Sequence, residues 1–319
     1  MYSAHMPIAY MGAAGSFSNI AALNLFPAGQ LHPQETFDDC FKSICEGHCR
    51  RAVIPIENSS AGPVRDVQKL LSERDFYIVG EYFLRINHLL LALPGVKLED
   101  LSQVRSHAQA LAQCQNHLAD LNLTPIAVRD TATAALGIIE SQDRTTGAIA
   151  SRLAASLYKL DILHENFEDS SLNTTRFIVI SKRPLPIYNR SKANIVSVKF
   201  KAKKCQVDNI KKNISKIGFV ILKLQNFTAN ENLELHEFYM EIDWRTQTAS
   251  LYEIIESISK HCETAQYLGT YPQHSYRYTA GTDVNTCNQL QLAQEQIAAT
   301  NPVLKSNDAR ATLPAHMVA

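Results

Sequence analysis

The order of apolar runs and turn residues predicts an α/β unit over about the first 190 residues, followed by a smaller α+β unit. In the first unit, short apolar runs alternate with helical patterns, a rhythm typical of largely parallel strands. Pro184 and Pro186 interrupt regular structure between Lys182 and Lys192, which indicates a linker. Beyond it, elements in the order β-α-β-β-α-β follow, which is the ferredoxin-like arrangement.

The strands of the first unit are expected where β-branched and apolar residues lie between turn signals. The most distinct helix is expected at Ala108–Leu121, where apolar residues recur at a spacing of three to four. Ser106 and Gln109 form a capping-box pattern that would begin this helix directly after a strand. The expected strands are Ile8–Gly12, Arg51–Ile56, Ile78–Leu84, Val104–Ser106, Pro125–Val128, Gly147–Ala150 and Phe177–Ser181.

The second unit is expected to pack two helices on one face of a four-stranded sheet, because its second helix carries an apolar stripe. Residues 276–319 are rich in Gln, Asn, Thr and Ala, which predicts a mobile tail with a short helix near Gln289–Ala298. In chain order the elements are Ala193–Lys201 (strand), Gln206–Ile217 (helix), Val220–Leu224 and His236–Asp243 (strands), Ala249–His261 (helix) and Ala265–Tyr271 (strand).

Composition excludes several classes of function. Lys and Arg together number 31, as do Asp and Glu, so no global field favours nucleic acid or an anionic membrane. The apolar runs are too short to span a bilayer and the N-terminus lacks a signal-peptide pattern, so a cytoplasmic location is expected. The seven cysteines indicate reduced thiols rather than a disulfide framework. The 45% hydrophobic content is typical of a soluble globular protein with a large core. Cys40, Cys45, His48 and Cys49 lack paired metal-binding spacing, and a cysteine-rich helix is favoured over a zinc site.

Five short stretches occur in one order and carry the chemistry of a small-anion site. They are Gly12–Ser18, Val53–Ser59, Ser106–Leu111, Gly147–Ser151 and Asn173–Phe177. Together they resemble the prephenate dehydratase family and its close relatives, the arogenate dehydratases, over roughly residues 7 to 275. This resemblance implies a catalytic domain over residues 1–190 built like type II periplasmic-binding proteins. It also implies an ACT domain, an amino-acid-sensing module, over residues 193–275.

The implied catalytic domain has two lobes with a cleft between them, formed by residues 7–95 with 170–182 and by residues 96–169. The implied reaction removes carbon dioxide and a ring hydroxyl together, so that prephenate becomes phenylpyruvate or arogenate becomes phenylalanine. Such a reaction needs a proton donor, groups that hold carboxylates and a dry cleft, but no cofactor and no metal. The sequence leaves the choice between the two substrates open.

Thr175 and Arg176 are the first candidates for the site. The resemblance makes Thr175 the donor to the leaving hydroxyl, where the alternative is an ordinary strand threonine. Arg176 would form a bidentate pair with a substrate carboxylate, where the alternative is a salt bridge at a strand edge. Thr174 and Phe177 flank the pair and are expected to line the substrate.

Other candidates lie where strands give way to helices or turns. Asn58 and Gln109 are expected to act with Thr175, since ligands of open α/β sheets bind beyond the carboxyl ends of strands. Capping by Gln109 and an Asn/Ser turn at Asn58 are the structural alternatives. The remaining expected substrate contacts are hydroxyl or imidazole groups that could hold an anion: Ser16, Ser18, Ser59, Ser60 and His107.

The sequence also departs from the family pattern. Ala14, Ser16 and Ala108 replace usual residues without removing a donor that the reaction requires. The two ACT ligand sequences are absent, and Lys203–Val207 and Gln225–Thr228 stand in their approximate places. We therefore expect a homodimer that responds weakly or not at all to phenylalanine. The alternatives are a non-catalytic binder of an aromatic precursor and a relative that decarboxylates without forming an aromatic ring.

Overall fold

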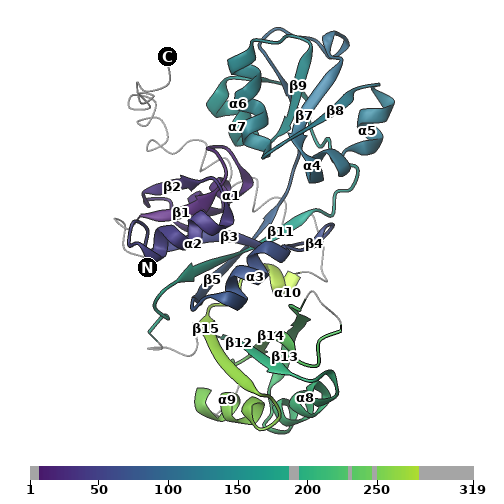
Figure 1. The fold of residues 1–319 in the computed structure, drawn as a ribbon. Coiled ribbons are helices and arrows are strands. Elements are labelled where there is room, and N and C mark those ends of the chain that lie inside the picture. The colour runs from purple at the N-terminus through teal and green to yellow at the C-terminus, as the bar shows by residue number, and fades with distance from the viewer. Residues whose placement is uncertain (1–6, 187–193, 229–231, 246–249, 280–319) are drawn as a thin grey trace.

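A computed structural model of the chain describes residues 7–186, 194–228, 232–245 and 250–279. Two α/β lobes and a C-terminal α+β unit follow one another along the long axis of the molecule, with the first lobe in the middle (Figure 1). The predicted fold class is confirmed: two α/β lobes, each with a mixed sheet, are followed by an α+β unit with an antiparallel sheet. The helix expected near Gln289–Ala298 and the tail beyond residue 279 lie outside the described residues.

The first lobe is built on a sheet with the order β2-β1-β3-β11-β5. Strand β1 is parallel to β2 and β3, whereas β11 is antiparallel to both β3 and β5. The strands are β1 (Ile8–Met11), β2 (Leu31–Gln34), β3 (Arg51–Asn58), β5 (Tyr77–Arg85) and β11 (Thr174–Ser181), with the two-residue β4 (Gly62–Pro63) beside β3; the helices are α1 (Phe17–Leu25), α2 (Phe37–Cys45) and α3 (Arg65–Glu73).

The second lobe is built on a sheet with the order β10-β6-β9-β7-β8, in which β7 is parallel to β8 and β9. Its core is almost entirely aliphatic, with Leu89 to Leu91, Val104 and Ile149 each 0% exposed. The elements are β6 (Leu89–Ala92), η1 (Leu98–Asp100), β7 (Gln103–His107), α4 (Ala108–Ala112), α5 (Gln115–Asp120), β8 (Thr124–Val128), α6 (Thr131–Ser141), β9 (Thr146–Ala150), α7 (Arg152–Tyr158) and β10 (Asp161–His164).

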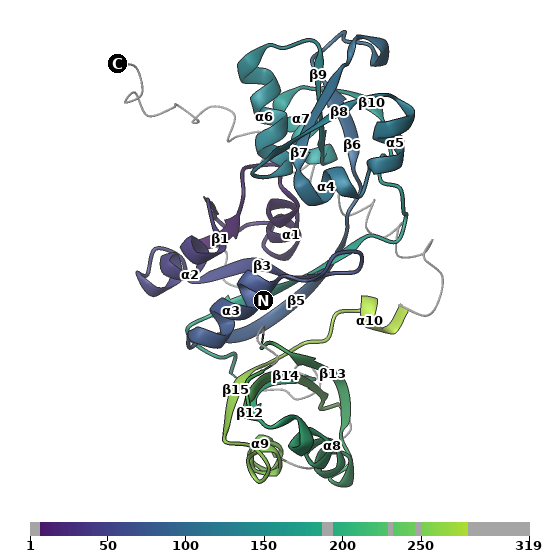
Figure 2. The same cartoon turned by 45° about the vertical axis from the view of Figure 1, so that its right-hand side comes forward.

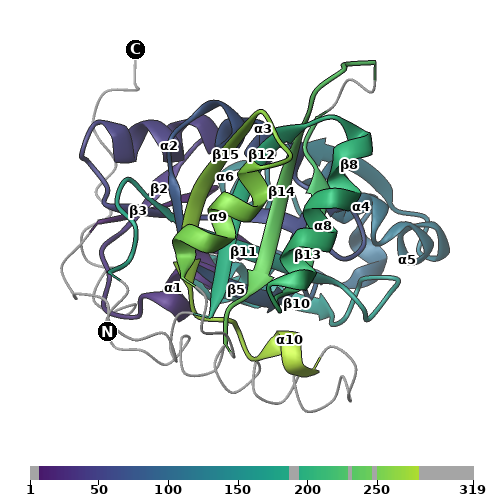
Figure 3. The same ribbon diagram turned by 90° about the horizontal axis from the view of Figure 1, so that it is seen from below.

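The C-terminal unit has the predicted β-α-β-β-α-β order, in an antiparallel sheet with the order β13-β14-β12-β15. Its two helices cover the face of the sheet that points away from the first lobe, as Figure 3 shows from below. The elements are β12 (Ile195–Ala202), η2 (Lys204–Gln206), α8 (Val207–Lys216), β13 (Val220–Asn226), β14 (His236–Asp243), α9 (Leu251–Ser259), β15 (Thr264–Tyr271) and the short α10 (Tyr276–Thr279).

The other face of the C-terminal sheet packs directly on the first lobe. Tyr239, Leu268 and Tyr271 belong to one continuous hydrophobic core with Ile178 of β11. Gly269 is required at this junction because a Cβ atom there would collide with the carbonyl oxygen of Ile78 on β5. The two units therefore share a buried boundary at β5 and β15, which Figure 2 shows beneath the first lobe.

Some expectations about local structure were wrong. The strands of both lobes form mixed sheets and are not largely parallel. The helix expected at Ala108–Leu121 is divided into α4 and α5 near Gln113. The N-cap of α4 is His107, while the Ser106 hydroxyl donates a hydrogen bond to the carbonyl oxygen of Ile149. Strand β6 belongs to the second sheet, so the second lobe includes part of the stretch 7–95 that was assigned to the first.

Candidate active site

Strand β11 places adjacent side chains of the Thr-Arg motif on opposite faces of the first sheet. Successive strand residues alternate in direction, so Thr175 and Phe177 share one face and Arg176 and Ile178 share the other. Phe177 packs in the core with α1, whereas Ile178 packs in the core that reaches the C-terminal unit. Thr175 and Arg176 are therefore neighbours in the chain but lie in two separate environments.

Thr175 lies in a buried group of uncharged polar side chains. Asn58 is its cross-strand partner on β3, and the Asn58 Nδ2 atom donates hydrogen bonds to Thr175 Oγ1 and to Asn173 Oδ1, both at 2.8 Å. Asn58 and Thr175 are each 8% exposed and Asn173 is 1% exposed. Because the threonine oxygen accepts the amide proton, its own hydroxyl proton remains available for donation.

Two further residues, which the sequence analysis did not single out, extend this group into the second lobe. The Gln113 Oε1 atom accepts a hydrogen bond from Asn173 Nδ2 at 2.9 Å and lies 3.0 Å from His88 Nε2. His88 and Asn173 lie on the two chain segments that connect the lobes, and the backbone N–H of His88 is fixed by Glu168. Gln113 Nε2 and His88 Nδ1 are buried and have no hydrogen-bond partner among the described residues.

Burial determines the protonation state of this group. Desolvation lowers the pKa of His88 to about 4, against its ordinary 6.5, although its hydrogen bond with Gln113 acts in the opposite direction. His88 is therefore neutral at pH 7, and its Nε2–H can donate to Gln113 Oε1. With both Asn173 and His88 donating to its oxygen, Gln113 has its Nε2 donor free.

The serines after β3 support the turn beside Thr175. The Ser59 hydroxyl donates to the carbonyl oxygen of Leu172 and accepts from the N–H of Thr174. The N–H groups of Ser60 and Ala61 both donate to Asn58 Oδ1. These two N–H groups therefore already donate to Asn58 and are not free to bind an anion. Ser59 and Ser60 themselves are exposed.

The loop Gly12–Ser18 of the first lobe contacts the second lobe. Ser16 is the N-cap of α1, its hydroxyl accepting from the N–H of Asn19 at 3.2 Å, and Ser18 is buried in the first turn. The Ser151 hydroxyl, from the N-cap of α7, donates to the carbonyl oxygen of Gly15 at 2.5 Å. Phe17 meets the His88 ring edge-on with 5.4 Å between centroids, so this loop reaches the buried polar group.

Two other predicted site residues lie at the start of α4 in the second lobe. The Nδ1 atom of the exposed His107 accepts a hydrogen bond from the N–H of Gln109 at 3.3 Å. Within the described part of the chain, Gln109 makes no hydrogen bond to Asn58 or Thr175, and its predicted contact with the substrate stays a prediction. Gln113, one helical turn beyond Gln109, is the residue of this segment that bonds to the buried polar group, through Asn173 and His88.

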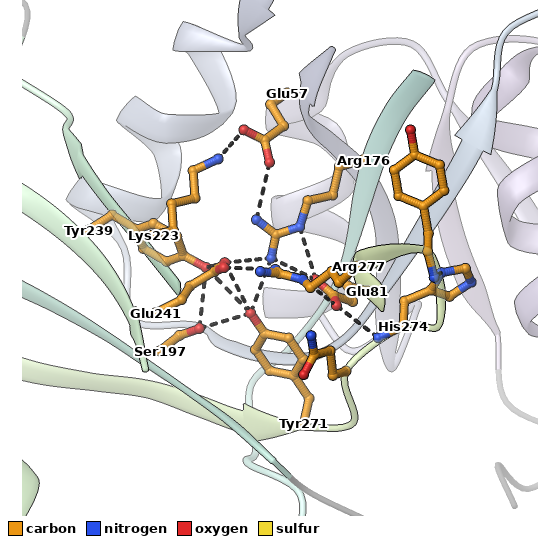
Figure 4. Close-up of polar contacts among 12 residues, drawn as sticks. Glu57, Glu81, Arg176, Ser197, Lys223, Tyr239, Glu241, Tyr271, His274 and Arg277 are labelled. Carbon is orange, nitrogen blue, oxygen red and sulfur yellow. Dashed lines mark hydrogen bonds and ion pairs between the residues drawn. The ribbon is translucent and has the colours of Figure 1, made fainter. Parts of the chain in front are cut away.

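Arg176 has a different environment from the one expected. Its side chain is 2% exposed and contacts Glu81 Oε2 at 2.8 Å, Glu241 Oε1 at 2.5 Å and Glu57 Oε1 at 3.3 Å (Figure 4). The guanidinium therefore binds carboxylates of the protein, and this geometry does not fit the predicted clamp on a substrate carboxylate. Phe177 likewise is 2% exposed within the core and does not line an open surface.

The electrostatics of the Arg176 cluster are those of a closed ion-pair network. Burial alone would raise the pKa of Glu241, but Arg176 and Arg277 outweigh it and lower that pKa to about 2. Tyr239 and Tyr271 donate hydrogen bonds to the same carboxylate. Lys223 of β13 pairs with Glu57 on the outer side of the cluster.

The described residues show neither a metal-binding cluster nor a membrane-spanning helix. Across the described ranges, no group of three or more His, Cys, Asp or Glu side chains could hold a metal ion. The cysteine-rich segment is helical over Phe37–Cys45, with Cys40 buried and Cys45 exposed. Among the helices of the described residues, none is both long and apolar enough to cross a membrane.

The fold and the buried hydroxyl–amide group define an enzyme of the two-lobed α/β class with an appended α+β unit. The family profile described as "Prephenate dehydratase" matches residues 8–185. The bifunctional N-acyl-homoserine lactone acylase/prephenate dehydratase of Komagataeibacter europaeus is 31% identical over 85% of this chain and 97% of that relative. The chain belongs to the prephenate dehydratase family, a family of hydro-lyases.

Two other similarities complete the comparison. Arogenate dehydratase 2 of Petunia hybrida is 44% identical over 56% of this chain, which spans 45% of that relative. The solved structure of the Arthrobacter aurescens prephenate dehydratase in complex with L-Phe has a TM-score of 0.75 at 20% identity. The matched region covers 91% of this chain and 99% of the Arthrobacter chain, so the similarity of fold extends through the C-terminal unit.

Proposed function

We propose that this dehydratase of phenylalanine biosynthesis acts on prephenate, with Thr175 as the proton donor to the leaving hydroxyl. The observation that carries the proposal is the hydrogen bond from Asn58 Nδ2 to Thr175 Oγ1 at 2.8 Å. It orients the threonine oxygen as an acceptor and leaves the hydroxyl proton to be given away as the C–O bond breaks. Loss of carbon dioxide in the same step leaves the aromatic ring, so neither a cofactor nor a metal is needed.

Gln113 is the second substrate contact that we propose. Its oxygen is held by Asn173 and His88, so the amide cannot rotate without losing two hydrogen bonds. The free Nε2 donor is thereby fixed in direction, and it can bind a substrate oxygen without further ordering of the side chain. Asn58, Asn173 and His88 then serve as the groups that orient Thr175 and Gln113.

The carboxylates of the substrate require donors other than Arg176. We propose that Ser16 and Ser18 at the start of α1 and His107 and Gln109 at the start of α4 provide them. Hydroxyl, imidazole and amide groups can each donate a hydrogen bond to a carboxylate. Thr174, Ser59 and Ser60 lie at the rim of the same site.

Arogenate is the second candidate substrate, and one observation favours it. The relatives that are 43–44% identical to this chain over 178 residues include arogenate dehydratases, whereas the bifunctional prephenate dehydratase relative is 31% identical. The two substrates differ only in a keto or an amino group on the side chain.

Turnover of the purified full-length chain with each substrate tests both proposals. Prephenate should give phenylpyruvate with the higher kcat/KM, and the Thr175→Ala variant should lose that activity. Preferential formation of phenylalanine from arogenate would select the second candidate. Binding of either compound without any turnover would instead indicate a non-catalytic binding protein.

We also propose that the active form is a homodimer assembled through the C-terminal unit. Val220 on the edge strand β13 and Tyr252 on α9 are 62% and 74% exposed, which are large apolar exposures for a single chain. Sedimentation of the wild type and of a Val220→Lys/Tyr252→Lys variant tests this, since a dimer through these faces should dissociate. An unchanged dimer in the variant would place the interface elsewhere.

A further inference from the structure

The ion-pair network around Arg176 contains a second arginine, which comes from the far end of the described chain. Arg277 Nη2 lies 2.6 Å from Glu81 Oε2 and 2.7 Å from Glu241 Oε2. Arg176 Nη2 contacts the same two residues, at 2.8 Å and 2.5 Å. Each carboxylate is thus shared by both arginines, and both carboxylate side chains are 0% exposed. This four-residue cluster is electrically neutral only when Arg277 is present.

Arg277 belongs to α10, which follows β15 in the chain and lies beside the boundary between the first lobe and the C-terminal unit (Figure 2). The backbone N–H of His274 donates to Glu81 Oε1 at 2.9 Å. The Tyr276 ring stacks on Phe83 of β5, with 4.9 Å between centroids and 20° between planes. The Tyr276 hydroxyl also lies 3.4 Å from Thr174 Oγ1. The segment therefore touches β11 on both sides of Thr175 through Thr174 and Arg176.

Charge balance decides how much this contact matters. Buried carboxylates are tolerated only when they are paired, and removal of one partner leaves an uncompensated charge in a region of low dielectric. Without Arg277, the two carboxylates would share one arginine, and the buried cluster would carry one uncompensated negative charge. Arg176 is covalently joined to Thr175, so a displacement of its backbone moves the proposed proton donor.

We propose that Arg277 is a positioning residue for the dehydratase reaction, which holds Thr175 in register by completing the neutral cluster Arg176–Glu81–Glu241–Arg277. The inference rests on the proposed role of Thr175. It assigns the C-terminal unit a direct part in the reaction, because the segment that carries Arg277 is fixed by β15. A 1 Å displacement of a reacting group can cost about 10²-fold in rate, so the effect should appear in kcat.

Three variants of the full-length chain form the test: Arg277→Gln, Glu81→Gln and the double variant. The first should lower kcat by roughly ten- to a hundredfold and change KM less than about threefold. Glu81→Gln leaves two arginines on one carboxylate and should also lower kcat. The double variant restores neutrality with Arg176 and Glu241, so its kcat should recover to within about threefold of the wild type. Arg245→Gln, which removes an exposed arginine of the same unit, is the matched control.

A pH profile separates this role from a loss of structure. In Arg277→Gln, kcat should rise relative to the wild type as the pH falls from 8 towards 5.5, because uptake of one proton restores neutrality. Glu81→Gln and the double variant should show no such recovery. The groups that face the two carboxylates, and could contribute to the profile, are Arg176, Tyr239, Tyr271 and His274, with Glu57 and Lys223 on the outer side of Arg176.

The outcomes are distinct. The proposal is overturned if Arg277→Gln folds and keeps a kcat within about twofold of the wild type. It is also overturned if the kcat of the double variant does not exceed that of each single variant. If Arg277→Gln does not fold, the comparison of Glu81→Gln with the double variant carries the same test. If Thr175→Ala stays fully active while the Arg277 series behaves as expected, the assignment of the proton donor fails and the coupling of Arg277 to turnover stands.

Discussion

The two faces of β11 present opposite solutions for burying polar groups. On the Thr175 face, hydroxyl and amide groups form hydrogen bonds without a formal charge, and two donor or acceptor atoms remain unpaired. On the Arg176 face, formal charges are buried and fully paired between the first lobe and the C-terminal unit. A neutral group with spare hydrogen-bonding capacity can exchange a proton with a ligand, whereas a closed ion-pair cluster holds its strand in place.

The difference teaches how a single dipeptide serves two purposes. Arg176 next to Thr175 suggested two groups acting on one substrate, yet alternation along the strand sends them in opposite directions. Variants on the two faces should therefore differ in what they change. Variants on the Arg176 face should change the stability and should affect the reaction only through the position of the strand, whereas variants on the Thr175 face should affect the reaction directly.

The largest effect is expected for Arg176→Gln, which breaks the pairs of Arg176 with Glu81 and Glu241 and leaves one buried negative charge uncompensated beside Arg277. Breaking a buried ion pair costs about 3–5 kcal/mol, and we expect a loss of this size in the free energy of unfolding. Denaturant unfolding measures it. Arg152→Gln, which removes an exposed pair with Glu165, should cost less than about 1 kcal/mol. Equal losses for the two variants would contradict the role of the buried cluster.

Thr175→Ala should lower kcat by about 10² to 10³ while the stability changes little, because the lost donor acts mainly in the transition state. Steady-state kinetics with the preferred substrate measures this. Thr124→Ala, at an exposed position of β8 that the proposal does not involve, is the control and should keep most of the activity. Near-wild-type turnover of Thr175→Ala would remove that residue from the mechanism.

Gln113→Ala should lower kcat/KM by roughly tenfold, since it removes one fixed donor and leaves Asn173 and His88 without their acceptor. Gln109→Ala tests the competing assignment on the same helical segment. The structure predicts the larger loss at Gln113. A larger loss at Gln109 would show that the family motif identifies the substrate contact better than the hydrogen bonds do.

A pH effect is expected from His88, whose pKa falls from an ordinary 6.5 to about 4 in the folded protein. Between these values the unfolded chain binds a proton that the folded chain excludes, so stability is lost as the pH falls through this window. The loss by pH 4 is on the order of 3 kcal/mol. His88→Gln should flatten this part of the profile. The contribution of Glu241 is lost only below pH 4.5, towards its folded pKa of about 2.

The smallest effect is expected from phenylalanine. The two sequences that would hold it in an ACT domain are absent, and an effector acts only through different affinities for two states. Titration of the enzyme should show little or no inhibition. Strong saturable inhibition would instead point to an effector site at Gln225–Thr228, where Asn226 and Thr228 already form a local hydrogen-bonded turn.

Much of the fold could be predicted from local patterns. The β-α-β-β-α-β order of the C-terminal unit follows from short apolar runs and one amphipathic helix, and its strands lie within a few residues of the expected ranges. Strands β2 and β10 were missed because they are short, are half exposed and contain histidine, proline or aspartate, which weakens a strand signal. The apolar run of β6 was read as too short to span a bilayer rather than as a strand of the second lobe.

The candidate site was only partly predictable for a different reason. Asn58 and Thr175 could be named because each lies within a recognisable motif. The carboxylate partners of Arg176 are Glu57, Glu81 and Glu241, and Arg277 shares two of them. These four residues lie on four separate elements, and no local pattern connects them. The division of the helix at Gln113 was the available signal for that residue, but an apolar stripe at helical spacing conceals such a break.

Gly15 gives the contact between the lobes an unusual dependence on one missing side chain. Its φ is +87°, and a Cβ atom there would lie 2.8 Å from Ala154 Cα, while Ser151 and Tyr158 hydrogen-bond the carbonyl oxygens of Gly15 and Ala14. Because Gly15 carries a hydrogen atom in place of a side chain, the loop and α7 can approach each other closely. A movement that separates the loop from α7 must break both hydrogen bonds, so these few atoms hold the two lobes together at this point. A Gly15→Ala substitution would push the loop away from α7 and weaken the contact between the two lobes.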